Sequence, residues 1–155
     1  MNEKYALGVD IGGPHIACQV VELGSSRPVG ETYTEVKIAE NESAQKILAA
    51  WDSALGACMQ KAGARAITGL GVAMPSPFDF IKGIAMAEHK FASIKGMNVR
   101  AELHRLTGID PSRILFTNDA AGFGMGAWSL GGGNARHLIG VTLGTGFGAC
   151  FIVDG

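Results

Sequence analysis

The chain has 155 residues and a formal net charge of −1, with 47% hydrophobic and only 17% charged residues. This balance excludes a low-complexity disordered chain, and it gives no electrostatic case for binding nucleic acid or an anionic membrane surface. Glycine is abundant, at 23 residues, but it does not recur at every third position, so a collagen-like helix is excluded as well. We therefore expect a folded domain whose glycines serve tight turns or close approach to a ligand.

The sequence shows no sign of a secretory leader or a membrane span. Residues 1–4 lack the basic-then-apolar layout of a signal peptide, and no apolar run approaches the roughly 20 residues that cross a bilayer. The three cysteines, Cys18, Cys58 and Cys150, are too scattered for a metal knuckle or a redox motif and are interpreted as buried thiols. We expect a cytoplasmic protein that binds neither nucleic acid nor a membrane.

The first part of the chain predicts a β-meander followed by a helix. Apolar and β-branched runs, separated by Gly-rich turns, predict three strands over residues 5–9, 16–23 and 29–36. Apolar residues then recur at helical spacing between Ser43, a favourable N-cap residue, and Gly63, a favourable stop. This pattern predicts an amphipathic helix over the intervening residues.

The following part alternates strands and helices. It predicts a strand at 66–73, a helix between Asn98 and Gly108, a strand at 114–117 and a Gly- and Ala-rich helix that ends near residue 130. Together with the β-meander, this order predicts an α/β domain over residues 1–130, with a mixed five-stranded sheet and flanking helices.

The last part of the chain, residues 131–155, follows a Gly-rich break. It predicts two strands at 138–143 and 149–153, and no later element of this sequence covers them. An isolated two-stranded hairpin is marginally stable and its open edge invites pairing. We therefore expect the hairpin to begin a second domain of a longer chain or to pack on another subunit, and we expect a homo-oligomer.

Glycines or carboxylates follow three of the predicted strands, in 10–13, 118–119 and 144–148. Glycines at such positions expose backbone N–H groups that can surround a phosphate, a nearby carboxylate can hold Mg²⁺, and a second carboxylate can accept a proton from a hydroxyl. Each segment also has a purely structural interpretation: a hairpin turn at Gly12-Gly13, a β-turn at 144–148 and an N-cap at Asp119.

Four motifs in order resemble the ROK family (repressors, open reading frames and sugar kinases) of the sugar kinase/Hsp70/actin superfamily. The matching stretches are Gly8-Val9-Asp10-Ile11-Gly12-Gly13, the segment from Gly69 to Asp79 with Pro75-Ser76-Pro77, Asn118-Asp119-Ala120, and Leu143-Gly144-Thr145-Gly146-Phe147-Gly148. They extend from near residue 5 almost to the last residue, and they are specific jointly rather than singly.

The resemblance implies a ribonuclease-H-like (actin-like ATPase) domain over 1–130, with 131–155 as the first hairpin of a second, similar domain. It implies part of an ATP-dependent sugar kinase of the hexokinase or glucokinase type, with ATP and Mg²⁺ as cofactors and a hexose as substrate. The alternative is a non-catalytic ROK domain that binds sugar as a sensor.

The resemblance also implies roles for individual residues. Asp119 would be the general base on the sugar hydroxyl, and Asn118, Asp119 and Ser76 would bind the sugar. Asp10 would organise Mg²⁺ through water. The ATP phosphates would lie against five residues of the two Gly loops: Gly12, Gly13, Gly144, Thr145 and Gly146.

The chain departs from the family pattern at several positions. Pro14 replaces a threonine and supplies neither its hydroxyl nor its N–H, Ser76 replaces the glycine of Pro-Gly-Pro, and Ala121 and Ala127 replace Asn and Glu. Pro14 favours the sensor, whereas the intact Asn118-Asp119 pair favours the kinase. The family's zinc motif has no counterpart here, so we expect no zinc site, and we expect His15 to be a solvated turn residue.

Overall fold

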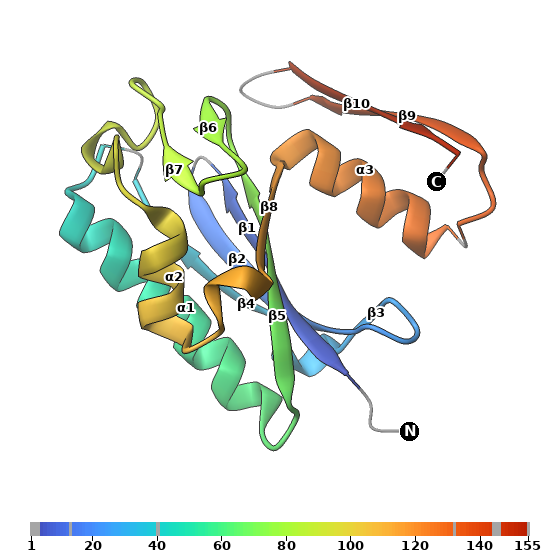
Figure 1. Ribbon diagram of the computed structural model, residues 1–155, viewed down its shortest axis with the longest axis horizontal. Helices are drawn as coiled ribbons and strands as arrows, with labels where there is room; N and C mark the ends of the chain where they lie inside the picture. Colours follow the sequence, from blue (N-terminus) through green and yellow to red (C-terminus); the bar gives the residue numbers. More distant parts are fainter. Residues whose placement is uncertain (1–3, 13, 40, 132, 144–146, 155) are drawn as a thin grey trace.

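The computed structural model describes residues 4–12, 14–39, 41–131, 133–143 and 147–154, and a mixed β-sheet forms its centre (Figure 1). The central strand β1 (Tyr5–Gly12) pairs antiparallel with β2 (His15–Glu22) and parallel with β5 (Ile67–Met74), which in turn pairs parallel with β8 (Ile114–Asn118). Two short strands, β3 (Arg27–Pro28) and β4 (Thr34–Lys37), both pair with β2. The sheet thus has six strands rather than the predicted five, because β3 and β4 both lie beside β2 where a single strand was expected. The mixed α/β fold is confirmed.

Two helices, α1 (Ala44–Ala62) and α2 (Val99–Thr107), cover one face of this sheet (Figure 1). The predicted caps are confirmed: the Ser43 side chain accepts a hydrogen bond from the backbone N–H of Lys46, and Gly63 ends α1 with a φ of +63°. Asn98 and Gly108 cap the two ends of α2 in the same way. Short-range capping signals therefore sufficed to place both helices.

Residues of each strand alternate between the two faces of the sheet. Leu7, Val9 and Ile11 of β1 are 0%, 5% and 0% exposed and belong to the core that the sheet forms with α1 and α2. Asp10 lies between Val9 and Ile11 in the strand, and its side chain is half-buried on the opposite face of the sheet. We call the side under α1 and α2 the covered face and the side that carries Asp10 the open face.

The prediction of one strand over residues 29–36 is wrong in its middle. A 3₁₀ turn, η1 (Gly30–Thr32), separates β3 from β4. The buried Thr32 side chain explains the break, since its Oγ1 accepts a hydrogen bond from Val20 N at 2.9 Å and donates one to Val29 O at 2.6 Å. A side chain thus replaces the backbone partner that a continuous strand would offer to β2.

The connections also contain short elements that the sequence did not predict. They are the hairpin strands β6 (Phe78–Asp79) and β7 (Ile84–Ala85) and the 3₁₀ turns η2 (Ala92–Ile94) and η3 (Pro111–Arg113). Helix α3 (Asp119–Leu130) follows β8, and the antiparallel hairpin of β9 (His137–Leu143) and β10 (Phe147–Val153) follows α3.

Helix α3 packs closely against the β9–β10 hairpin (Figure 1). A Cβ atom at Gly124 would lie 2.0 Å from Cys150 Sγ, so only glycine permits this approach. The other face of the hairpin exposes a row of large apolar side chains: Ile139, Val141, Leu143, Phe147, Phe151 and Val153. The division of the chain at residue 130 and the self-association through this hairpin stay predictions.

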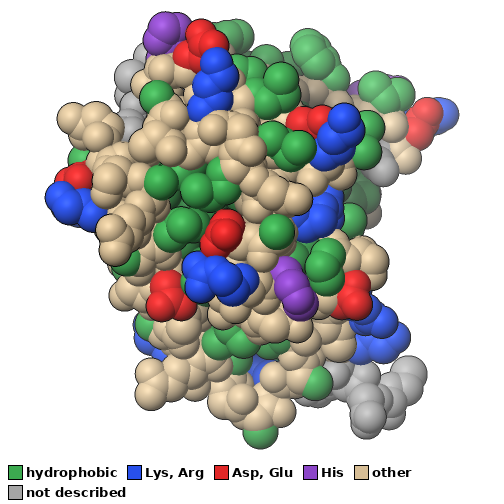
Figure 2. Space-filling view, turned by 60° about the vertical axis from the view of Figure 1, so that its left-hand side comes forward, with side chains coloured by type: hydrophobic (Ala, Val, Ile, Leu, Met, Phe, Trp, Pro, Cys, Tyr) green, Lys and Arg blue, Asp and Glu red, His purple; other side chains and the backbone are tan. Residues whose placement is uncertain are grey.

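The surface over the helices carries interspersed charges of both signs (Figure 2). Within the described ranges, no helix combines the length and the apolar character that crossing a membrane requires. Cys18, Cys58 and Cys150 are buried and free, as expected.

Candidate functional site

Three parallel strands, β1, β5 and β8, end at the same edge of the sheet, the upper edge in Figure 1. Asp10 lies near the end of β1 opposite Ala73 of β5, and Asn118 ends β8 opposite Met74 of β5. Ser76 follows β5 by two residues, and Asp119 is the first residue of α3. The structure therefore brings four of the predicted site residues, distant in sequence, to one edge.

Two hydrogen bonds fix the Asn118 side chain at the start of α3. Its Oδ1 accepts from the backbone N–H of Ala120 at 3.0 Å, and its Nδ2 donates to Ser76 Oγ at 3.3 Å. Asp119 Oδ1 accepts from the same N–H at 2.8 Å. The N-cap residue of α3 is thus Asn118 rather than Asp119, and Asp119 presents an exposed carboxylate at the edge.

Asp10 lies on the open face beside His15, with 3.6 Å between Asp10 Oδ2 and His15 Nε2. Burial raises the pKa of Asp10 above its ordinary value; the neighbouring His15 opposes this effect, and the negative charge of Asp119 adds to it. The charge of Asp119 is therefore near enough to affect the protonation of Asp10. This is a property common to sites that move protons or bind cations, although structural networks share it.

His15 was expected in a solvated turn, and its placement in the turn is wrong, although its side chain is 32% exposed. It is the first residue of β2 and pairs with Gly12, which places it on the same face as Asp10. The sequence did contain a usable signal: with the turn predicted between Gly12 and His15, the strand period of two puts residues 10, 12 and 15 on one face.

A cavity of about 930 Å³ lies on the open face, between the sheet, α3 and the hairpin. Asp10 and Asp119 line it, and its walls and floor are otherwise mainly apolar or small, including Gly8, Gly71, Ala73, Phe123 and Met125. A mainly apolar cavity with a few convergent polar groups is the usual form of a small-molecule site.

The predicted phosphate loops are only partly visible. Gly12 ends β1 at the edge that carries the site, whereas Gly13, Gly144, Thr145 and Gly146 lie outside the described residues. Pro14 O accepts a hydrogen bond from Ile38 N at 2.8 Å, so this residue anchors the turn to the segment after β4. The cradle for phosphates stays a prediction.

For metals, the described part of the chain contains no cluster of three or more His, Cys, Asp or Glu side chains that could hold an ion. The carboxylates of Asp10 and Asp119 are hard oxygen donors, which suit Mg²⁺ held partly through water. This chemistry fits Mg²⁺ bound together with a phosphate ligand better than an ion held by protein alone.

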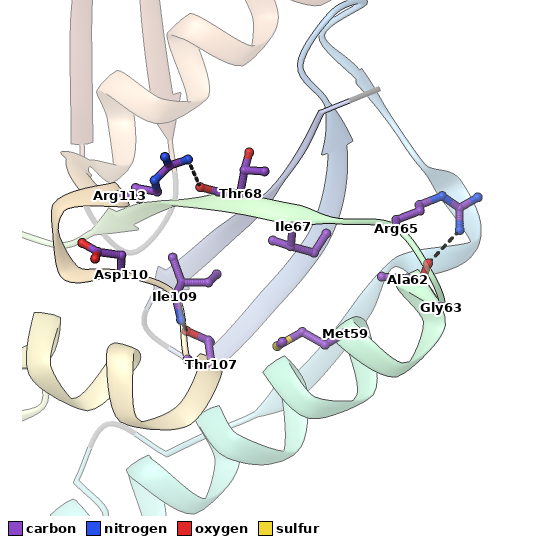
Figure 3. A pocket seen from close by; sticks show the side chains of 11 residues that line it. Met59, Ala62, Gly63, Arg65, Ile67, Thr68, Thr107, Ile109, Asp110 and Arg113 are labelled. Carbon is purple, nitrogen blue, oxygen red and sulfur yellow. Dashed lines mark hydrogen bonds between the residues drawn. The ribbon is translucent and has the colours of Figure 1, made fainter. Parts of the chain in front are cut away.

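A second pocket, of about 460 Å³, lies at the opposite end of the sheet, between the end of α1, the start of β5 and the loop after α2 (Figure 3). Its arginines are engaged with backbone carbonyls: Arg65 donates to Ala62 O and Arg113 donates to Thr68 O (Figure 3). Arg65 also pairs with Glu31. None of the predicted site residues lines this pocket, so the open-face cavity is the candidate site.

Comparison with known proteins gives one family match. The model of the ROK family matches residues 6–155, nearly the whole chain. No curated protein matches the sequence.

Solved structures of ROK proteins share the fold. A ROK glucokinase from Streptomyces griseus, in complex with glucose and AMPPNP, is 22% identical with a TM-score of 0.74, and a ROK hexokinase from Thermus thermophilus is 23% identical with a TM-score of 0.72. A ROK transcriptional regulator, described as a homologue of the E. coli MLC protein, is 19% identical with a TM-score of 0.69. These matches cover 97%, 97% and 98% of this chain but 45%, 47% and 37% of the three structures, so the chain spans less than half of their length.

Proposed function

This chain belongs to the ROK family, and on that premise we propose that it is the N-terminal part of an ATP-dependent sugar kinase of the hexokinase or glucokinase type. The observation that carries the proposal is the meeting of Asp10, Asn118 and Asp119 at one edge of the sheet, where Asp10 and Asp119 line the open-face cavity. A regulator needs only to bind its sugar, whereas a kinase also needs a base and a group that organises the phosphoryl donor. The three side chains fit those three tasks.

Asp119 is proposed as the general base. Its carboxylate is exposed at the cavity, and the backbone N–H of Ala120 holds one of its oxygens. From there it accepts the proton of the attacking sugar hydroxyl, a contribution that is typically about 10²–10⁴-fold in rate. Asn118 binds the sugar beside it, with Ser76 next to Asn118.

The phosphoryl donor belongs on the side of Asp10. ATP would supply the γ-phosphoryl group and Mg²⁺ would neutralise its charge. Asp10 would hold Mg²⁺ through water, and the phosphates would lie against Gly12, Gly13, Gly144, Thr145 and Gly146. We propose that the protein acts on a hexose in the cytoplasm.

The alternative is a ROK domain that binds sugar as a sensor. Pro14 favours it, since proline offers neither a hydroxyl nor an N–H to a terminal phosphate. The structural likeness to the ROK transcriptional regulator is compatible with the same interpretation. Under this alternative, Asn118 and Ser76 still bind sugar, but Asp119 transfers no proton.

A chimera decides between these two functions. Residues 1–155 are joined to the part of the Thermus thermophilus ROK hexokinase that this chain does not match, and a coupled assay follows ATP consumption with glucose. We expect phosphorylation that the added part alone does not support. Glucose binding by calorimetry without turnover, in a chimera that melts cooperatively, would favour the sensor; a folded chimera that neither binds nor turns over glucose would contradict both.

A further inference from the structure

We propose that Ser76 is a positioning residue that fixes the Asn118 side-chain amide and thereby sets the polarity of the sugar oxygen that the site accepts. This inference rests on the proposed function, because it specifies how the same site recognises its substrate. It starts from a side chain that stands where the family motif has glycine.

The orientation of the Asn118 amide is set first by α3. Asn118 Oδ1 accepts the N–H of Ala120 at 3.0 Å, and a backbone N–H can only donate, so the oxygen must face the helix. The Nδ2 group is therefore the end of the amide that is turned away from the helix N-terminus. On the side away from the helix, Asn118 therefore presents a hydrogen-bond donor to a ligand.

Ser76 provides the second anchor. Its Oγ accepts one hydrogen of Asn118 Nδ2 at 3.3 Å, across from the end of β8 to the loop after β5. Since that oxygen accepts from Asn118, the hydroxyl hydrogen of Ser76 is turned elsewhere, and Ser76 is exposed at the edge that carries the site. A glycine at position 76 would leave the amide held at one end only.

The result is a row of side-chain groups in which hydrogen-bond donors lie beside a hydrogen-bond acceptor. The second Nδ2 hydrogen of Asn118 and the hydroxyl hydrogen of Ser76 are donors, whereas the adjacent Asp119 carboxylate is an acceptor. Two hydroxyls that lie close together on a sugar fit this row, because one donates its proton toward Asp119 while the oxygen of the other accepts from Asn118 and Ser76. At that second oxygen only an acceptor is needed, so fluorine can replace it and hydrogen cannot.

Nuclear magnetic resonance of the ligand-free chain tests the anchor. We expect Ser76→Ala to shift the side-chain amide signals of Asn118 and to speed their exchange with water, and Ser76→Thr, which keeps the hydroxyl, to restore them. Ser53→Ala, at an exposed position on α1, is the matched control and leaves these signals unchanged. Unchanged Asn118 signals in Ser76→Ala would overturn the proposal.

Calorimetry with glucose and its monodeoxy and monodeoxyfluoro analogues tests the recognition. We expect one ring position at which the deoxy sugar binds about five- to tenfold more weakly, as for a lost hydrogen bond, while the fluoro sugar retains most affinity. In Ser76→Ala this difference should disappear and glucose itself should bind a few-fold more weakly. An identical ranking of the analogues in Ser76→Ala and the parent would overturn the assignment. If the parent binds no glucose, the proposed function and the substrate part fail together, and the resonance experiment still decides whether Ser76 anchors Asn118.

Discussion

The two faces of the central sheet are built from the same strands but differ in almost every physical property. On the covered face, Leu7, Val9 and Ile11 of β1 are almost completely buried under α1 and α2. On the open face, the intervening positions are small or charged, with Gly8 beside Gly71 in register and Asp10 beyond them. Alternate residues of one strand thus serve stability on one side and provide the candidate site on the other.

The small residues of the open face lower the stability of the fold but leave room for a ligand. Glycine in a strand interior loses more entropy on folding and packs no side chain. In return, Gly8, Gly71 and Ala73 leave room for the cavity of about 930 Å³ that reaches Asp10 and Asp119. The face that contributes least to the core is therefore the one that can admit a ligand.

The largest difference between the faces should appear in folding stability. We expect Leu7→Ala, at a fully buried position of the covered face, to lower the free energy of unfolding by about 2–5 kcal/mol. Leu115→Ala makes the same chemical change on the open face at a side chain that is 69% exposed, and it should cost about 0.5 kcal/mol or less. Urea titrations measure the free energy of unfolding of both variants. Similar losses in the two would contradict the proposed difference between the faces.

A smaller effect is expected where α3 and the hairpin form the outer wall of the cavity. A Cβ at Gly124 would lie 2.0 Å from Cys150 Sγ, so Gly124→Ala should force the two elements apart and destabilise the chain by about 1–3 kcal/mol. Gly126→Ala is the control on the same helix, because its Cβ would meet nothing within 4 Å and should stabilise α3 slightly. A thermal melt in which the two variants behave alike would contradict this packing.

The smallest effect concerns Asp10, the charged residue of the open face. Burial raises its pKa in the folded chain above its ordinary value of 3.8, so the folded state retains this proton to higher pH than the unfolded state. The resulting stability is present below pH 3.8 and is lost as the pH rises through the folded-state pKa. Relative to Asp10→Asn, the parent should therefore lose stability as the pH rises from below 3.8 toward neutrality in a chelator-containing buffer.

Replacing the neighbour of Asp10 sharpens this measurement. His15 lowers the pKa of Asp10, so His15→Gln should raise it further and steepen the loss of stability with pH. If the parent instead gained stability relative to Asp10→Asn as the pH rises, the pKa of Asp10 would be lowered in the folded chain. That result would contradict burial as the main influence on this pKa.

The elements that the sequence predicted well are those with local signals. Ser43, Gly63, Asn98 and Gly108 mark the helix ends because a cap involves only neighbouring residues. The break between β3 and β4 was missed because it depends on the Thr32 hydroxyl reaching Val20, twelve residues away. Sequence patterns over a few neighbouring residues cannot indicate a contact of this kind.

The candidate site likewise has one part that the sequence could predict and another that it could not. The motifs that contain Asp10, Asn118 and Asp119 follow strands, so their meeting at one edge could be inferred from a parallel arrangement. The pair Asn118–Ser76 could not, since it depends on side-chain rotamers and on how the loop after β5 lies beside the end of β8. For Asp10 and His15, the strand period indicates the shared face, whereas the approach to 3.6 Å depends on the side-chain rotamers. The packing of α3 on the hairpin likewise depends on Gly124 meeting Cys150.

The most direct test of Asp119 as the general base is the rate of phosphoryl transfer by Asp119→Asn in the chimera. Glucose binding to the same variant is measured in parallel. The proposed role of Asp119 predicts that the rate falls by about 10²–10⁴-fold, as for a lost general base, while glucose affinity changes little. Asp52→Asn, the same change at an exposed position of α1, should keep the full rate. A rate for Asp119→Asn within tenfold of the parent would contradict Asp119 as the base.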